Sequence, residues 1–84
     1  MMLESELAWH LADEYGDRFT AADRSTVFVH IGAGDFAEAI SFLLEVCARQ
    51  RISLTAEALA SLTEWLRVYD RSADFGAAVA RVAG

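Results

Sequence analysis

The chain has 84 residues, of which 55% are apolar and 11% aromatic, and it contains no proline. A chain of this length forms one small domain, and this composition excludes a disordered tail or linker. The formal net charge of −6 excludes direct nucleic-acid binding, because such proteins need a basic surface to neutralise phosphates. For the same reason we expect no binding to anionic membrane surfaces.

The charge is unevenly distributed along the chain. Residues 1–45 carry nine acidic side chains and two arginines, a net of −7, whereas residues 46–84 carry four acidic side chains and five arginines, a net of +1. An acidic surface of this kind favours a basic protein partner. No apolar stretch is long enough to span a membrane, no signal-peptide order is present, and the single Cys47 excludes an internal disulfide, so we expect a cytoplasmic protein.

The first expected helix begins at about Leu3 and ends near Gly16. Its apolar residues Leu3, Leu7 and Leu11 recur at every fourth position, which is the spacing of one helix face. The acidic residues fall on another face, and Asp17 is expected just beyond the helix end.

A second helix is expected from Thr20 to about Ile31, because Thr-Ala-Ala-Asp resembles a capping box. Residues 26–31 are mostly β-branched or aromatic, which favours a strand locally. A single strand would have no partner elsewhere in the chain, so we predict a helix with Val27, Phe28 and Ile31 facing inward.

The third expected helix spans about residues 35–50 and should lie at the centre of the fold, because apolar residues cover nearly its whole circumference. We expect Asp35 to cap it and Glu38 to reach back to the cap amide. A fourth helix follows a cap at Ser53 or Thr55, and a fifth begins at Ser72 or Asp74. Residues 1–84 are therefore predicted to form a single all-α domain, a compact bundle of four to five short helices.

Residues 32–37 spell G-x-G-x-x-A, the form of a dinucleotide-binding fingerprint. A working fingerprint needs a buried strand before it and an acidic residue at the end of a later strand. Glu57 lies about 20 positions further along the chain, as the fingerprint requires, but we expect it to start a helix. Asp35 would also occupy the amides that a pyrophosphate needs. We interpret the glycines as a joint between two helices.

No other pattern indicates chemistry. His10, His30 and Cys47 lack the spacing of zinc ligands, and Cys47 falls on a core position as a small hydrophobe. We therefore predict no catalytic residue, no metal site and no cofactor, and a protein that is not an enzyme.

One family pattern is present over about residues 3–70. A helix is followed by an apolar segment, a Gly-Asp joint, a helix of the form A-φ-x-x-L-φ (φ, apolar) and an I-x-L-T cap. The matching residues are Gly34-Asp35, Ala39-Ile40, Leu43-Leu44, Ile52, Leu54, Thr55, Leu59 and Leu62. In this order the chain resembles the MafI-like immunity proteins of bacterial polymorphic toxin systems.

The resemblance implies binding and neutralisation of a cognate toxin domain, such as a nuclease with a basic cleft. It agrees with the acidic first half of the chain, and Trp9 and Tyr15 would then be aromatic anchors. The expected partner-binding residues are Glu6, Trp9, Asp13, Glu14, Asp17, Glu38 and Glu45. Two alternatives are a helical interaction subunit, for example a homodimer, and a nucleotide-binding protein that uses residues 32–37.

Overall fold

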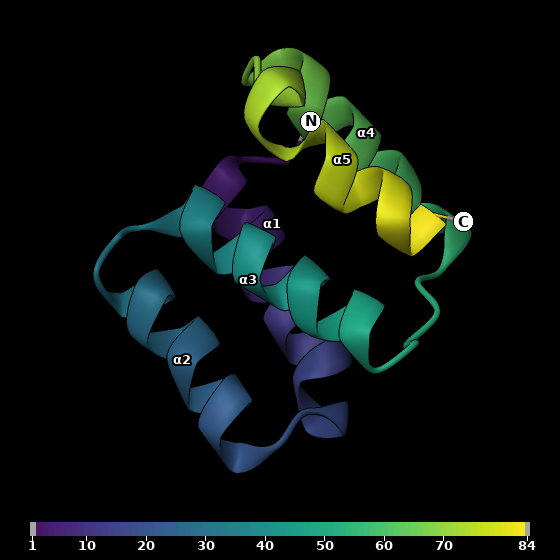
Figure 1. Ribbon diagram of the computed structural model, residues 1–84. Helices are drawn as coiled ribbons and strands as arrows, with labels where there is room; N and C mark the ends of the chain where they lie inside the picture. Colours follow the sequence, from purple (N-terminus) through teal and green to yellow (C-terminus); the bar gives the residue numbers. More distant parts are fainter. Residues whose placement is uncertain (1, 84) are drawn as a thin grey trace.

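A computed structural model describes residues 2–83, and within them it contains five α-helices, one short 3-10 helix and no strand (Figure 1). The elements in chain order are α1 (Glu4–Tyr15), η1 (Gly16–Arg18), α2 (Ala21–Gly32), α3 (Phe36–Arg49), α4 (Ala56–Val68) and α5 (Ser72–Ala83). The all-α prediction is confirmed, and each expected helix lies within a few residues of its predicted bounds.

Helix α3 is the centre of the bundle, as its apolar circumference predicted. It packs against α1 behind it in Figure 1, α2 on one side and α5 on the other. Six of its residues are buried: Ala39, Ile40, Leu43, Leu44, Val46 and Cys47. Burial of such side chains stabilises the fold by about 1.5–3 kcal/mol for each large one, so this helix supplies much of the core.

Helix α2 forms despite its strand-like residues. The hydroxyl of Thr20 accepts the N–H of Asp23 at 3.1 Å, which satisfies one of the unpaired amides of the first turn. Val27 and Ile31 are buried against the bundle, whereas Phe28 is only half-buried. Tertiary packing of one helix face therefore outweighs the local preference for strand.

Three helices end in the same way. The residue after the cap adopts a left-handed backbone, with φ of 81° at Gly34 after α2, 56° at Arg51 after α3 and 54° at Asp70 after α4. In each case the following N–H reaches back to a carbonyl five positions earlier, as in Ile52 N to Cys47 O at 2.9 Å. These are Schellman motifs, in which glycine is the usual left-handed residue. Residues 32–37 thus contain the end of α2, a turn and the start of α3, as the joint interpretation predicted.

The predicted side-chain cap at Asp35 is wrong. Its carboxylate makes no capping hydrogen bond, and no hydrogen bond from Glu38 back to the cap is present among residues 2–83. The caps Thr20 and Thr55 have an extended ψ near 158°, whereas Asp35 has a ψ of 65°, because its N–H closes the preceding motif on His30 O. The tight joint turns its side chain away from the amides.

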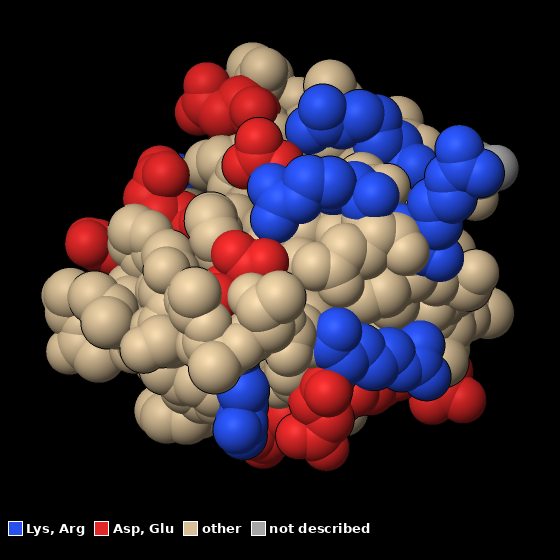
Figure 2. All heavy atoms as spheres, turned by 60° about the horizontal axis from the view of Figure 1, so that its bottom comes forward, with Lys and Arg blue, Asp and Glu red and all other residues tan. Residues whose placement is uncertain are grey.

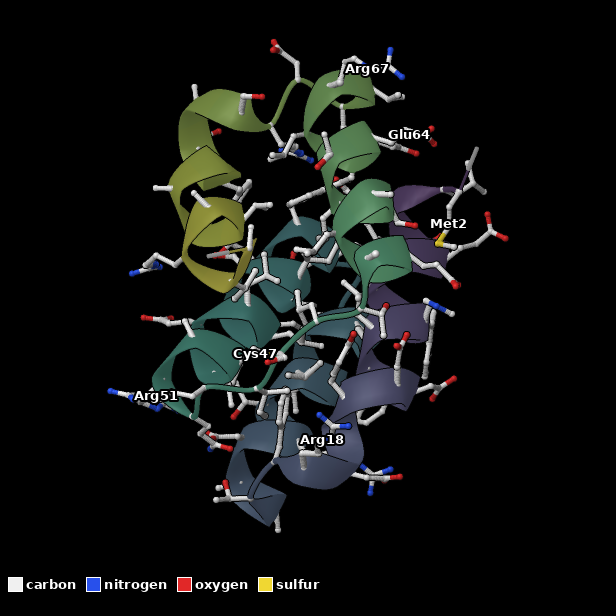
Figure 3. The ribbon with its side chains drawn as sticks, turned by 90° about the vertical axis from the view of Figure 1, so that its right-hand side faces the viewer. Met2, Arg18, Cys47, Arg51, Glu64 and Arg67 are labelled. Atoms are coloured by element: carbon white, nitrogen blue, oxygen red, sulfur yellow. The ribbon has the colours of Figure 1, made fainter. Side chains whose placement is uncertain are left out.

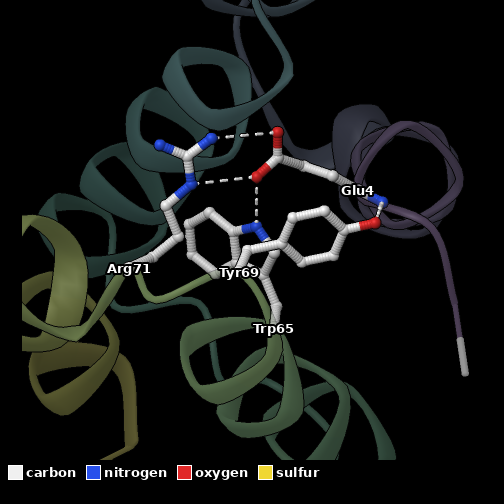
Figure 4. A network of polar contacts seen from close by, with 4 residues as sticks. All are labelled: Glu4, Trp65, Tyr69 and Arg71. Atoms are coloured by element: carbon white, nitrogen blue, oxygen red, sulfur yellow. Dashed lines mark hydrogen bonds and ion pairs between the residues drawn. The ribbon is translucent and has the colours of Figure 1, made fainter.

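A polar network fixes the start of α1 to the α4–α5 pair (Figure 4). The Trp65 Nε1–H donates to Glu4 Oε2 at 2.7 Å, and the Arg71 guanidinium donates to both Glu4 oxygens at 3.1 and 3.3 Å. The Glu4 N–H donates to the Tyr69 hydroxyl at 3.0 Å. The Glu4 side chain is only 16% exposed, so this carboxylate belongs to the packed part of the fold.

Candidate functional site

All seven predicted partner-binding residues are exposed. Five of them lie on α1 and η1 and two on α3: Glu6, Trp9, Asp13, Glu14 and Asp17, then Glu38 and Glu45. Exposure leaves each side chain accessible to a partner, but a single partner can contact all of them only if they share one surface.

The seven residues form two groups that face different directions. Helices α1 and α3 pack against each other, so the exposed side of each points away from the other. Helix α2 lies between the two exposed sides, because Phe28 contacts Trp9 of α1 while Asp23 accepts an ion pair from Arg49 of α3 at 3.2 Å. We call the larger group, Glu6, Trp9, Asp13, Glu14 and Asp17, the α1 face.

An aromatic pair is the apolar part of the α1 face. Trp9 is 48% exposed. Its ring centroid lies 5.6 Å from that of Phe28, and the two ring planes form an angle of 49°. The Arg24 guanidinium lies 5.5 Å from the Phe28 centroid, within the range of a cation–π contact. Arg24 and Phe28 line an open hollow of about 400 Å³ together with Ala21 and Ser25. Trp9 thus contacts Phe28 with part of its ring, while about half of its surface remains accessible to solvent.

The acidic side chains around Trp9 are weakly engaged within the protein. Glu6 accepts the N–H of Leu3 at 2.9 Å, and Glu14 lies 3.3 Å from the imidazole of His10. Asp13 and Asp17 make no ion pair, and none of these four acids contacts an arginine among residues 2–83. Their negative charge is therefore directed to solvent.

Tyr15 cannot serve as an aromatic anchor, so that prediction is wrong. Its ring is 2% exposed, and its hydroxyl accepts the N–H of Thr55 at 2.9 Å, which joins α1 to the start of α4. The sequence did not single out Phe28 and Arg24 as surface residues. No spacing rule could have found them, because their position depends on the contact between α1 and α2.

The nucleophile and metal-ligand residues are not assembled into a site. Cys47 is fully buried, and burial raises the pKa of its thiol to about 11, an effect that the charge of Arg18 partly offsets. The thiol therefore stays protonated at neutral pH and is a poor nucleophile. The ring of His30 packs 6.4 Å from that of Phe42. Residues 2–83 contain no group of three or more His, Cys, Asp or Glu side chains placed to hold a metal ion.

Within the described part of the chain, no helix has the length and apolar character needed to cross a membrane. Comparisons with protein-family models, with curated proteins and with solved structures gave no match to this chain.

Proposed function

We propose that this protein binds and neutralises a basic toxin domain in the bacterial cytoplasm, and that the α1 face makes the contact. The protein is then an immunity protein, and the toxin domain is of a type, such as a nuclease, that carries a positively charged cleft. The proposal rests on the resemblance in sequence and on the properties of the α1 face.

The observation that carries the proposal is the half-exposed Trp9, which contacts Phe28 and shares its helix face with acids that form no ion pair with an arginine among residues 2–83. Energetically dominant interface residues are enriched in tryptophan and lie at the centre of a patch with a polar rim. A ring already held by Phe28 loses little conformational freedom on binding. Trp9 therefore has the properties of an anchor, and the acids have those of a rim.

Electrostatics suit the same partner. Carboxylates on an exposed helix face steer a basic partner toward it and raise the association rate, and this effect weakens as salt rises. Removing a rim charge changes mainly the association rate, whereas removing a buried anchor changes mainly the dissociation rate. The two kinds of residue can therefore be separated by kinetics.

The test uses the C-terminal domain of the protein encoded by the reading frame next to this gene, with binding rates measured at low and high salt. The triple variant Glu6→Gln, Asp13→Asn, Asp17→Asn should slow association at low salt, and Trp9→Ala should speed dissociation. Glu38→Gln with Glu45→Gln is the matched control, because it removes acids from the other exposed side. If only the control pair weakened binding, the contact would lie on α3, and if the domain did not bind at all, the immunity function would be wrong.

The alternative is a helical interaction subunit that forms a homodimer. Among residues 2–83, four large apolar side chains are exposed, namely Leu3, Trp9, Val29 and Val68, and Val29 is the most exposed of these at 67%. Sedimentation velocity distinguishes the two: a stable dimer at micromolar concentration favours the subunit. A monomer that binds the toxin domain in a salt-sensitive way favours the immunity function.

A further inference from the structure

A second hollow lies at the opposite end of α3 from the Gly34 joint. It has a volume of about 250 Å³ and lies between the last turn of α3, the segment that leads to α4, and the end of α5. Its lining residues include the basic Arg51 and Arg81, the polar Ser53 and the apolar Ile52 and Val82. Figure 3 shows Arg51 at the outer end of this segment, with Cys47 further inside.

Arg51 and Arg81 belong to the arginines whose charge no carboxylate neutralises by an ion pair within residues 2–83. Arg49 pairs with Asp23 at 3.2 Å and Arg71 with Glu4 at 3.1 Å, whereas Arg51 and Arg81 have no ion pair among residues 2–83. On the face drawn in Figure 2, basic side chains gather mainly toward the upper right, whereas acidic ones lie mainly on the left and along the lower edge. In a protein of net charge −6, the lining of this hollow thus contains two arginines and no acidic residue.

The backbone at Arg51, just after α3, is unusual for the type of residue that adopts it. Its φ of 56° is a left-handed conformation at the position where Gly34 and Asp70 end the other two helices. Glycine adopts this conformation without penalty and aspartate tolerates it, but a long side chain such as arginine does so at a cost. Strain of this kind is often found at residues that serve a binding function.

We propose that this hollow binds the phosphate group of a small phosphomonoester. Guanidinium groups present planar forks of N–H donors that match phosphate oxygens, and a serine hydroxyl can donate a further hydrogen bond. Ile52 and Val82 provide an apolar wall for the carbon part of the ligand. The volume is below that of a typical drug-sized pocket, which limits the ligand to a small molecule.

The test is a titration with phenyl phosphate, followed by amide chemical shifts in NMR, with phenol as the uncharged control. We expect saturable binding of phenyl phosphate with shifts centred on residues 51–53 and 81–82, and no such shifts with phenol. Arg51→Gly should weaken binding about tenfold or more, the effect of losing a charge-assisted hydrogen bond. Arg81→Ala should have a similar effect.

The left-handed backbone provides a control for folding. Arg51→Gly should raise the melting temperature by a few degrees while it weakens binding, since glycine relieves the strain. Asp70→Gly, at the equivalent position after α4, should also raise the melting temperature but leave binding unchanged. Arg67→Ala removes one exposed positive charge elsewhere and should leave binding within about twofold, as expected for a screened surface charge.

The proposal would be overturned by an absence of saturable binding, or by equal weakening in Arg51→Gly and Arg67→Ala, which would show a response to net charge alone. The hollow shares no residue with the α1 face. The outcome of this test is therefore independent of the immunity function.

Discussion

Helix α1 has two sides that look alike in sequence and differ in role. The packed side carries Glu4 and Tyr15, whose polar atoms bond to α4 and to the segments around it. The solvent side carries Trp9 and the acids, of which Asp13 has no partner among residues 2–83. Both sides thus contain a carboxylate and an aromatic ring, yet one side serves the fold and the other is available to a partner.

Residue type alone therefore does not tell which side chains of α1 stabilise the fold and which are free to contact a partner. What separates Glu4 from Asp13 is the presence of Trp65 and Arg71, more than 60 positions away in the chain. What separates Tyr15 from Trp9 is the N–H of Thr55, 40 positions away. Four variants test whether the packed side of α1 contributes more to stability than its solvent side.

Among changes on α1, the largest effect on stability is expected for Glu4→Ala. It leaves the Trp65 Nε1–H and the Arg71 guanidinium without their acceptor in a partly buried site, and should lower the free energy of unfolding by about 2–4 kcal/mol. Asp13→Ala on the same helix should change it by less than about 0.5 kcal/mol. Urea denaturation of both variants measures the difference, and equal effects would mean that the network does not hold α1 in place.

Tyr15→Phe should have the next largest effect. The change keeps the ring in the core but removes the acceptor of the Thr55 N–H, which should lower the free energy of unfolding by about 1–2 kcal/mol. Tyr69→Phe is a suitable control because Tyr69 is half-buried and water can replace its hydroxyl. Thermal unfolding followed by circular dichroism should rank Tyr15→Phe as the less stable variant.

Trp9→Ala should cost less than either change on the packed side. The ring is already half exposed, so the main loss is its contact with Phe28, about 0.5–1 kcal/mol. Trp65 is only 3% exposed, so Trp65→Ala leaves a cavity in the core. It should lower the free energy of unfolding by about 3–5 kcal/mol in the same urea experiment. A large loss of unfolding free energy in Trp9→Ala would show that this ring stabilises the fold, and would argue against its role as an interface anchor.

The smallest effect is expected for the triple variant Glu6→Gln, Asp13→Asn, Asp17→Asn. Its free energy of unfolding should stay within about 0.5 kcal/mol of that of the parent protein. The amide oxygen introduced by Glu6→Gln can still accept the Leu3 N–H, and the other two side chains are exposed and unpaired among residues 2–83. Differential scanning calorimetry at low and high salt checks this. A strong loss of stability would show that the acids serve the fold.

The sequence predicted the helices well because their signals are local. Threonine at residues 20 and 55 identifies two helix starts, and apolar spacing identifies the central position of α3. The predicted cap at Asp35 is wrong because this residue belongs both to the Schellman motif that ends α2 and to the start of α3. The hydrogen bond from its N–H to His30 O restricts the backbone that a side-chain cap would need.

The candidate site could be predicted only in part. Exposure of the acids and of Trp9 follows from the helical period, but the split into two surfaces depends on how α1, α2 and α3 pack. The roles of Glu4 and Tyr15 depend on partners that sequence spacing cannot identify. The second hollow could not be predicted, because the left-handed backbone of Arg51 and its place in one hollow with Arg81 appear only in three dimensions.

The Glu4 network also has a consequence for the order in which the chain folds. Its hydrogen bonds join residues separated by 61 to 67 positions, whereas the contacts among α1, α2 and α3 close much shorter loops. On a ribosome, α1 is complete long before Trp65 and Arg71 emerge, so the first three helices can associate while Glu4 has no partner. The network then forms last, and its loss should speed unfolding in stopped-flow experiments while leaving the refolding rate nearly unchanged.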